Sequence, residues 1–276
     1  MAEISGEHLR STFDEAADLY DRARPGYPPE LFNDLADIAD LRPGARILEI
    51  GPGTGQATVP LAERKFQITA IELGPNLAAV ARRMLARFPN VAVTVAAFED
   101  FPLPSEPFDA VVSATAFHWL DPSVRVTKAA DALRVGGVLA TIATHHIDGG
   151  DAQFFIEVQD CYRRWFPAPL RYPGDGVLFR LPTAADIAMD STELERSGRF
   201  EPAVFRRYEW EQSYSAQEYI DVLSTYSEHR ALEENSRRHL LDCIERLIVE
   251  RYNGRIRKRY LNELQIARRR AQSAAF

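Results

Sequence analysis

Apolar residues recur with two different periods along the first half of the chain. Between residues 31 and 39 they follow helical spacing, and this pattern stops at the Leu-Arg-Pro-Gly of residues 41–44. From there to about residue 146, short aliphatic and β-branched runs alternate with helical stripes. Such alternation predicts a parallel sheet covered by helices. The expected strands are Arg46–Ile50, Gln67–Glu72, Val91–Val95, Phe108–Ala114 and Val138–Thr144.

The second half of the chain loses this alternation. From about residue 148 to residue 198 aromatic residues accumulate around a proline-rich turn at 167–173, and we interpret this segment as a cap inserted over the active site. Regular patterns then return. The expected elements are a strand at Ala203–Trp210, helices at Ala216–Thr225 and Leu232–Tyr252, and a last strand at Ile256–Ile266 with alternating arginine and apolar positions.

Composition limits the function classes. The chain has 276 residues, of which 46% are hydrophobic and 26% charged, as expected for a folded globular protein. Its formal net charge of −7 disfavours nucleic acid as the main substrate, and no apolar run approaches the ~18 residues of a membrane helix. The basic stretch 251–270 is expected to be a solvated strand face and tail. The alternative is that this stretch contacts an anion or a second subunit, and in the latter case the protein would be a homodimer.

The cysteines and histidines argue against a disulfide framework and a metal site. Cys161 and Cys243 are too few for such a framework and have no metal-type spacing, and residues 1–8 lack the pattern of an export signal. A reducing cytoplasm is therefore expected. His145 and His146 are adjacent, so on a strand they point to opposite faces, and we predict no bound metal.

The first expected strand runs directly into a glycine loop. Glu49 and Ile50 are followed by Gly51, Gly53 and Gly55, whose missing Cβ atoms let a ligand approach the main chain. A helix that begins near Gln56 offers unpaired N–H groups to such a ligand. A second acid, Glu72, ends the next strand 21 residues after Gly51. That spacing is typical of one βαβ unit with a carboxylate over a ribose.

Details of the loop favour a ligand without phosphate. Gln56 stands where a dinucleotide loop has its third glycine, and no lysine follows to meet the phosphates of a P-loop ligand. The carboxylate of Glu49 would repel a phosphate but would accept a hydrogen bond from an amino group. The pattern therefore points to a cofactor that carries a ribose and an ammonium group.

These motifs resemble those of a known enzyme family. Leu-Glu-Ile-Gly-Pro-Gly-Thr-Gly at 48–55 and Ala-Ile-Glu at 70–72 are similar to the first two motifs of class I S-adenosylmethionine-dependent methyltransferases. Residues 13–28 resemble the lid of the small-molecule branch, which includes trans-aconitate-type enzymes, and 117–122 resemble its fourth-strand motif. The resemblance covers about residues 13–146, and 254–268 look like the last strand.

The resemblance implies a fold and a division of the chain. The fold class is α/β, with a Rossmann-like, seven-stranded, mostly parallel sheet, helices on both faces and a helical, aromatic-rich cap insertion. The last two strands are expected to form a hairpin. The implied segments are an N-terminal lid and helix at 1–42, an S-adenosylmethionine-binding core at 43–146, the cap at 147–200, and C-terminal helices and strands at 201–276.

It also implies a set of site residues. Glu72 would accept the ribose hydroxyls with Leu73 against the adenine, and Arg24 would bind the methionine carboxylate in a lid with Tyr20. Ala97 stands where many relatives carry an adenine-binding aspartate, so Glu99 is the candidate substitute. The expected cofactor-binding residues are Tyr20, Arg24, Glu49, Gly51, Gly53, Thr54, Gly55, Gln56, Glu72, Leu73, Phe98 and Glu99. The candidates for acceptor binding are Tyr27, Trp119 and His146.

We therefore predict methyl transfer from S-adenosylmethionine to a small, apolar or aromatic acceptor. Oxygen is the favoured acceptor atom, and nitrogen, carbon and carboxylate remain open. His118 is the candidate general base, although it could serve only to position the loop, because methyl transfer often needs no base. The alternatives are a nicotinamide-dependent oxidoreductase and an inactive cofactor-binding regulatory protein.

Overall fold

The computed structural model describes residues 14–166 and 179–271, which divide into two compact units. The sheet unit comprises residues 25–144, 189–208 and 262–276, and the helix unit comprises 1–24, 145–188 and 209–261. Phe13, Tyr172 and the proline-rich turn at 167–173 lie outside the described residues. The division into four consecutive segments stays a prediction, and each unit is described below by itself.

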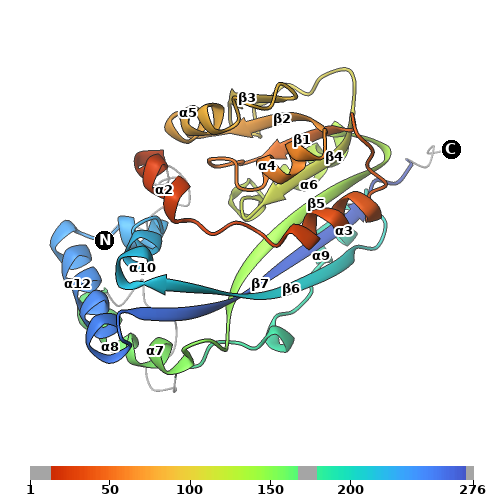
Figure 1. Cartoon of the computed structure of the whole chain (residues 1–276). Coiled ribbons are helices and arrows are strands. Elements are labelled where there is room, and N and C mark those ends of the chain that lie inside the picture. Colours follow the sequence, from red (N-terminus) through yellow and green to blue (C-terminus); the bar gives the residue numbers. More distant parts are fainter. Residues whose placement is uncertain (1–13, 167–178, 272–276) are drawn as a thin grey trace. The chain divides into compact units, whose positions relative to one another are not determined.

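Seven strands form one sheet in the order β3-β2-β1-β4-β5-β7-β6, which confirms the predicted fold class (Figure 1). The neighbouring pairs from β3 through β5 are parallel, and Ile47 lies opposite both Ile68 and Ala110. Parallel pairing brings the carboxyl ends of β1, β2 and β4 to one edge of the sheet. The strands are β1 (Arg46–Ile50), β2 (Gln67–Glu72), β3 (Val91–Val95), β4 (Phe108–Ala114), β5 (Leu133–Ile147), β6 (Val204–Ser215) and β7 (Arg255–Arg268).

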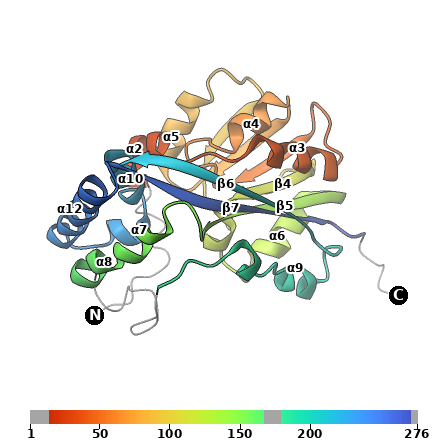
Figure 2. The same ribbon diagram turned by 60° about the horizontal axis from the view of Figure 1, so that its bottom comes forward.

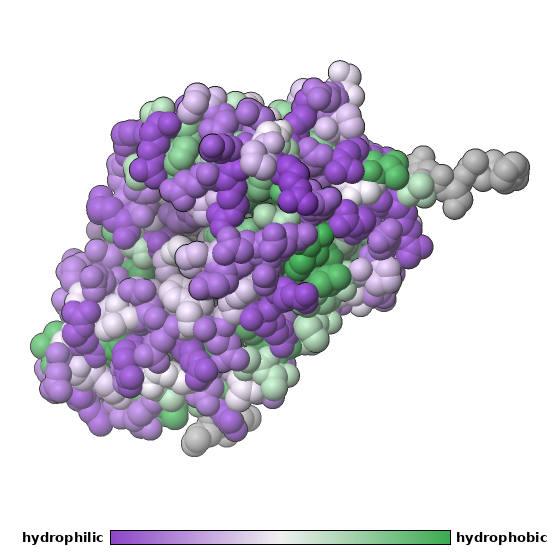
Figure 3. All heavy atoms as spheres, turned by 45° about the vertical axis from the view of Figure 1, so that its right-hand side comes forward, coloured by the Kyte–Doolittle hydropathy of each residue, from purple (hydrophilic) through white to green (hydrophobic). Residues whose placement is uncertain are grey.

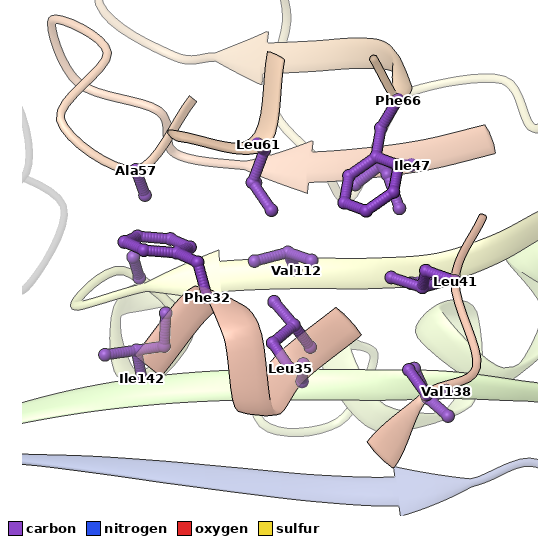
Figure 4. Close-up of a cluster of buried hydrophobic side chains, with 14 of the residues drawn as sticks. Phe32, Leu35, Leu41, Ile47, Ala57, Leu61, Phe66, Val112, Val138 and Ile142 are labelled. Carbon is purple, nitrogen blue, oxygen red and sulfur yellow. The ribbon is translucent and has the colours of Figure 1, made fainter. Parts of the chain in front are cut away.

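Helices α3 (Pro29–Ile38) and α4 (Thr58–Glu63) cover one face of the sheet unit. Proline at the first position of α3 suits a helix start, because that residue needs no N–H partner. Phe32 and Leu35 of α3 point toward Val112 and Ile142 of the sheet in Figure 4. Every second residue of a strand faces this core, for example Ala110, Val112 and Ala114 of β4. This is expected because side chains alternate between the two faces of a sheet.

The other face is covered by α6 (Arg125–Ala132) and α9 (Thr192–Ser197), which lie across the sheet from α3 and α4 in Figure 2. Leu48 and Val111 point to this second core, whereas their neighbours Ile47 and Val112 point to the first. Helix α5 (Pro75–Met84) packs on β2 and β3. Strands β1 and β4 are thus buried on both faces, as the inner strands of a parallel sheet require.

The helix unit has a core of its own. It contains α2 (Ala17–Ala23), α7 (Ala152–Glu157), α8 (Gln159–Trp165), α10 (Ala216–Leu223), α11 (Ser227–Arg230) and α12 (Glu234–Arg251). Phe154, on α7, is fully buried between the rings of Phe155, Tyr219 and Tyr252. Aromatic side chains dominate this core, and such edge-to-face contacts stabilise it beyond the area that they bury.

A disulfide joins Cys161 of α8 to Cys243 of α12. The expectation from the cysteine count was wrong on this point, because two thiols that are 82 residues apart in sequence meet in the helix unit. Sequence spacing alone carries no information about this meeting, which depends on how α8 packs against α12. The predicted reducing compartment stays a prediction.

The C-terminal elements differ in detail from the predicted ones. Strand β5 starts five residues earlier and ends three residues later than predicted, and β6 extends to Ser215. Strands β6 and β7 are neighbours, but α10, α11 and α12 connect them, so they do not form a hairpin with a short turn. A capping box in which Ser215 and Glu218 exchange hydrogen bonds starts α10 directly after β6.

One face of the molecule is mainly polar. Hydrophilic residues predominate on the face in Figure 3, and hydrophobic residues gather there only in small groups. In the part of the chain that the structure describes, none of the helices has the length and apolar character needed to cross a bilayer.

Candidate active site

The glycine loop after β1 is held in a conformation that side chains oppose. Gly51, Gly53 and Gly55 all have positive φ, at 66°, 60° and 110°. A Cβ atom added at Gly51 would lie 2.5 Å from the Cβ of Ala116, which follows β4. Glycine is therefore required at this position both for its backbone angle and for the close approach of the β4 loop.

Glu72 ties this loop to the end of β2. Its Oε2 accepts a hydrogen bond from the N–H of Gly53 at 2.9 Å, and its Oε1 accepts one from the N–H of Gly74 at 2.9 Å. The side chain is only 6% exposed. Each carboxylate oxygen has two lone pairs, so a carboxylate can accept hydrogen bonds from more than two donors, and a ribose hydroxyl is a suitable donor.

Glu49 is the most unusual polar group of the sheet unit. It is 1% exposed, and among the described residues no hydrogen bond reaches either carboxylate oxygen. Burial raises its pKa to about 7, the nearby Thr58 hydroxyl opposes this shift, and the negative charge of Glu72 adds to it. A buried carboxylate without donors is costly, so an ammonium group that met Glu49 would be strongly stabilised.

Two expected adenine contacts lie at the ends of β2 and β3. Leu73 is 40% exposed beside the buried Glu72, although it is a large apolar residue. Phe98 is fully buried, and Lys128 reaches over its ring. Glu99 follows it and accepts a hydrogen bond from the N–H of Asp121 at 3.0 Å. Glu99 therefore also links the β3 end to the loop after β4, and its role toward adenine stays a prediction.

The rest of the loop is held by short polar contacts. Thr54 is 2% exposed, and its hydroxyl accepts a hydrogen bond from the Gln56 side chain at 2.7 Å. The N–H of Gly55 donates to the carbonyl of Pro52. Helix α4 begins at Thr58, two residues later than the predicted start near Gln56. These contacts hold the loop in place, while the Glu49 carboxylate before it and the Thr58 hydroxyl after it are buried without a hydrogen-bond partner among the described residues.

His118 and Trp119 lie in a short 3₁₀ helix, η2 (Phe117–Trp119), beyond β4. His118 is exposed on one side and packs against the Trp119 ring, with the ring centroids 5.0 Å apart. Partial burial and the positive charge of Arg125 lower the pKa of His118. Arg125 is itself held by a bidentate ion pair with the carboxylate of Glu193. His118 is therefore neutral near pH 7 and has a ring nitrogen able to accept a proton.

Tyr27 joins the same edge of the sheet from the N-terminal side. Its hydroxyl lies 3.0 Å from the hydroxyl of Thr115, a residue with positive φ at the end of β4. Its ring also packs edge to face against Phe32. Tyr27 therefore has a structural role beside the loop, and its predicted contact with the acceptor stays a prediction.

The remaining predicted residues, Tyr20, Arg24 and His146, belong to the helix unit. Arg24 donates from Nε to the Thr225 hydroxyl at 2.8 Å and from a terminal nitrogen to the Thr225 carbonyl, and its guanidinium lies over the rings of Tyr20 and Tyr226. His146 packs against Phe155, with the ring centroids 4.3 Å apart. Their predicted roles toward the cofactor and acceptor stay predictions.

The basic stretch is less solvated than predicted. Arg251, Arg257 and Arg259 pair with Glu157, Asp151 and Glu209 on the surface of the helix unit. Lys258 lies between two of these arginines and yet is only 4% exposed. The prediction of a solvated face was wrong for Lys258, because Ile256, Lys258 and Tyr260 share the buried face of β7. The alternating pattern already contained this signal.

Comparison with known proteins agrees with the strand-end geometry. Residues 48–141, which contain the loop, Glu72 and η2, match the family described as "Methyltransferase domain". An uncharacterized methyltransferase of Anoxybacillus flavithermus is 30% identical over 153 residues, which cover 52% of this chain and 70% of that protein. The chain belongs to the class I S-adenosylmethionine-dependent methyltransferases. The matching family and the relative are methyltransferases and not oxidoreductases, so the oxidoreductase alternative is removed.

Other methyltransferases share only part of the chain. An uncharacterized methyltransferase of Mycobacterium tuberculosis is 35% identical over 138 residues, covering 50% of this chain and 54% of that protein. The chain thus spans about half the length of the first curated relatives that it matches.

Solved methyltransferase structures share the fold. A putative type II methyltransferase from Anaeromyxobacter dehalogenans has a TM-score of 0.57 and 25% identity, and the match covers 89% of this chain and 97% of that one. A phosphoethanolamine N-methyltransferase from Haemonchus contortus, solved with phosphomonomethylethanolamine and S-adenosylhomocysteine, has a TM-score of 0.54 and 16% identity, covering 98% and 61%. At this identity the second likeness concerns the fold alone.

Proposed function

We propose that this protein transfers the methyl group of S-adenosylmethionine to a small-molecule acceptor, with oxygen as the favoured acceptor atom. The observation that carries the proposal is the pair of buried carboxylates beside the glycine loop, Glu49 and Glu72. One has no hydrogen-bond donor among the described residues, and the other holds the loop in place. Ammonium and ribose groups on one ligand would satisfy both carboxylates.

The residues of the sheet unit fit this cofactor. Glu49 would accept hydrogen bonds from the ammonium group, and Glu72 would accept them from the ribose hydroxyls. The glycine loop would lie against the ligand at Gly51 and Gly53, which are half-buried, whereas Gly55 is buried against Leu85. Leu73 would offer an apolar surface to the adenine. When bound, S-adenosylmethionine supplies an electrophilic methyl group on a sulfonium.

The chain's own contribution to the reaction is mainly positioning. Holding an acceptor atom in line with the methyl group, away from water, can contribute ~7–11 kcal/mol to catalysis. His118 is neutral near pH 7 and would take the proton that an acceptor hydroxyl loses. An oxygen acceptor gains most from such a base, because a neutral hydroxyl is a weak nucleophile. This supports oxygen over nitrogen.

A nitrogen acceptor is the second candidate. The Haemonchus contortus protein, an N-methyltransferase, shares the fold over nearly the whole of this chain. An amine is nucleophilic without a base, so His118 would then only position the loop. Replacing His118 with asparagine separates the two cases. With an oxygen acceptor, His118→Asn would lose most of the wild-type kcat, and its remaining activity would rise with pH. With an amine acceptor, the variant would keep the wild-type kcat.

The cofactor assignment is tested by isothermal titration with S-adenosylhomocysteine. We expect wild-type protein to bind at micromolar Kd and Glu72→Ala to bind about 100-fold more weakly, a loss of about 2.8 kcal/mol, because a charged acceptor for two ribose hydroxyls is removed. Glu63→Ala is the matched control, since Glu63 is an exposed acid on α4 with one long surface pair. Its affinity should equal that of wild type.

Glu72 also holds two backbone N–H groups, so the loss could come from the loop. Glu72→Gln retains a carbonyl acceptor for one of these groups and should fall between wild type and Glu72→Ala. Thermal unfolding of each variant checks that the fold survives. A folded Glu72→Ala protein that binds as tightly as wild type would remove the ribose assignment.

Turnover separates an enzyme from an inactive cofactor-binding protein. Tritiated methyl transfer from S-adenosylmethionine is measured against pools of hydroxylated, amino and carboxylated small molecules, with Glu72→Ala as the negative control. Label in a product that requires Glu72 supports the proposal. Tight cofactor binding with no labelled product in any pool would favour the regulatory alternative.

A further inference from the structure

Lys258 is a buried lysine in an aromatic part of the helix unit. It lies on β7 and is 4% exposed, and its ammonium nitrogen lies 5.0–6.0 Å from the centres of the Tyr219, Tyr226 and Tyr260 rings. These cation–π contacts recover part of the hydration that the ammonium loses on burial. These contacts do not replace hydrogen-bond acceptors for its N–H groups, because a ring face is not a hydrogen-bond partner of normal strength.

The charge of Lys258 is not neutralised by an acid. Among the described residues no carboxylate forms an ion pair with it, and its hydrogen bond goes to the Tyr226 hydroxyl at 3.1 Å. The arginines on either side, the exposed Arg257 and the half-buried Arg259, do have acidic partners. A buried ammonium has three donors, and leaving it without a counter-charge costs several kcal/mol.

A second cation lies close to the same tyrosine. The guanidinium of Arg24 is 4.6 Å from the centre of the Tyr226 ring. Burial alone would raise the pKa of Tyr226, but the charges of Lys258 and Arg24 outweigh burial and lower it. Two positive charges therefore converge on Tyr226 from separate elements, the end of α2 and strand β7.

Two histidine nitrogens near Lys258 are also unsatisfied. Nε2 of His146 and Nδ1 of His229 are buried, and within the described part of the chain neither has a hydrogen-bond partner. Burial, followed by the charge of Lys258, lowers the pKa of His146 to about 2 and that of His229 to about 4. Both rings are neutral at physiological pH, and each is able to present an N–H donor without adding charge.

We propose that Lys258, Tyr226, His146 and His229 form a binding site for the carboxylate or phosphate group of a small molecule. An oxyanion would accept hydrogen bonds from the remaining N–H groups of Lys258. It would also supply the negative charge that the cluster lacks. The surrounding tyrosines would contact an apolar or aromatic body attached to that group. Tyr226 and His146 retain some exposed surface, so the cluster is not sealed from solvent.

The inference goes beyond the proposed function, because the proposed oxyanion site lies entirely within the helix unit and uses none of the cofactor residues of the sheet unit. The ligand that it would bind combines an apolar body with an acidic group. Both carboxylate and phosphate satisfy the chemistry of the cluster, and the two are distinguished by experiment.

Two simple probes test the site by titration calorimetry at constant ionic strength: benzoate for a carboxylate on an aromatic body, and inorganic phosphate. We expect wild-type protein to bind at least one of them, and Lys258→Met to bind it at least tenfold more weakly. Methionine nearly conserves the apolar volume but removes the charge. Binding of benzoate alone assigns a carboxylate, and binding of phosphate alone assigns a phosphate.

Arg255→Met is the matched control. Arg255 lies on the same strand and loses the same charge, but it is exposed and its only described side-chain contact is with Ser213 at 3.4 Å. This variant should bind the probe as wild type does. Equal affinity of Lys258→Met and wild type, or no binding of either probe to wild type, would overturn the proposal.

A measurement on wild type covers the case in which Lys258→Met does not fold. Crystals soaked in selenate should give an anomalous peak within hydrogen-bond distance of Lys258 Nζ, and a soaked crystal without that peak would argue against the site. S-adenosylhomocysteine titrated separately distinguishes the two proposals. Cofactor binding without oxyanion binding defeats only the Lys258 site, and oxyanion binding without cofactor binding defeats only the methyl-transfer proposal.

Discussion

The two units bury charges of opposite sign. In the sheet unit the buried groups beside the glycine loop are carboxylates, Glu49 and Glu72, whereas in the helix unit the buried group is the ammonium of Lys258. Backbone N–H groups hold Glu72, and tyrosine rings hold Lys258. Glu49 and Lys258 each lack an ionic partner among the described residues, which is costly for folding and favourable for binding.

The units also differ in how they are held together. The sheet unit relies on parallel strand pairing and two aliphatic cores, as expected of a cofactor-binding fold. The helix unit relies on aromatic contacts and on the disulfide between α8 and α12. We therefore expect perturbations to act on one unit at a time, and three experiments test this.

Reduction of the disulfide should have the largest effect. A disulfide between residues 82 positions apart lowers the conformational entropy of the unfolded chain, which stabilises the folded state by about 4.5 kcal/mol in the chain-entropy description. Dithiothreitol should therefore lower the free energy of unfolding by up to that amount. Urea unfolding followed by tryptophan fluorescence measures this, because Trp165 and Trp210 lie in the helix unit.

The double variant Cys161→Ser with Cys243→Ser is the control and should not respond to dithiothreitol. Binding of S-adenosylhomocysteine should survive reduction, because the cofactor residues of the sheet unit have no part in the disulfide. Identical unfolding curves with and without reductant would contradict the first expectation, and loss of cofactor binding on mild reduction would contradict the independence of the units.

Ionisation of Glu49 should have the next largest effect. Its pKa in the folded protein is about 7, above the unfolded value of 4.5, so the neutral acid is the form that suits the fold. Stability from this group is fully present below about pH 4.5 and is lost as the pH rises through 7, by up to about 3 kcal/mol. Glu49→Gln stays neutral at every pH, so wild type should lose urea stability relative to this variant between pH 5 and pH 8.

Saturating S-adenosylhomocysteine should reverse this trend if its ammonium group meets Glu49. Cofactor affinity should then rise between pH 6 and pH 8 in wild type, as the carboxylate ionises, and should stay flat in Glu49→Gln. A wild-type affinity that is independent of pH over this range would place the ammonium elsewhere.

Substitution in the glycine loop should have the smallest of the three effects on stability. Gly51→Ala adds a methyl group 2.5 Å from Ala116, whereas Gly44→Ala adds one where nothing lies within 4 Å, although both glycines have positive φ. The pair separates steric overlap from backbone strain. We expect Gly51→Ala to lower the free energy of unfolding by about 2 kcal/mol more than Gly44→Ala does.

Cofactor affinity sharpens this comparison. Gly51→Ala should bind S-adenosylhomocysteine at least tenfold more weakly than wild type, because the loop must shift to relieve the overlap with Ala116. Gly44→Ala should bind normally, since it precedes β1 at the far end of that strand. Equal affinities in the two variants would mean that the loop tolerates the shift.

The cofactor motif was predictable because its chemistry is local in sequence. Glycines at 51, 53 and 55 are needed for backbone angles within one turn, and Glu72 is placed by the length of one βαβ unit. The first five strands along the chain, β1 to β5, were predictable for the same reason, since parallel strands are short continuous apolar runs. The ends of β5 were not, because that strand continues past its apolar run.

Contacts between distant segments were not predictable. Tyr27 meets Thr115 across 88 residues, and Cys161 meets Cys243 across 82, so neither contact leaves a local pattern. Lys258 is an intermediate case. Its position in the alternation of β7 indicated a buried face, but its charge argued for solvent, and only the aromatic packing of the helix unit resolves that conflict.

The sequence by itself determined the family, the central sheet and the residues that end its strands, because short-range backbone geometry dictates those residues. The tertiary structure alone decided which charges are buried without partners and which thiols are joined. Burial and pairing depend on what the rest of the chain brings to each position, and the sequence around a residue does not contain that information.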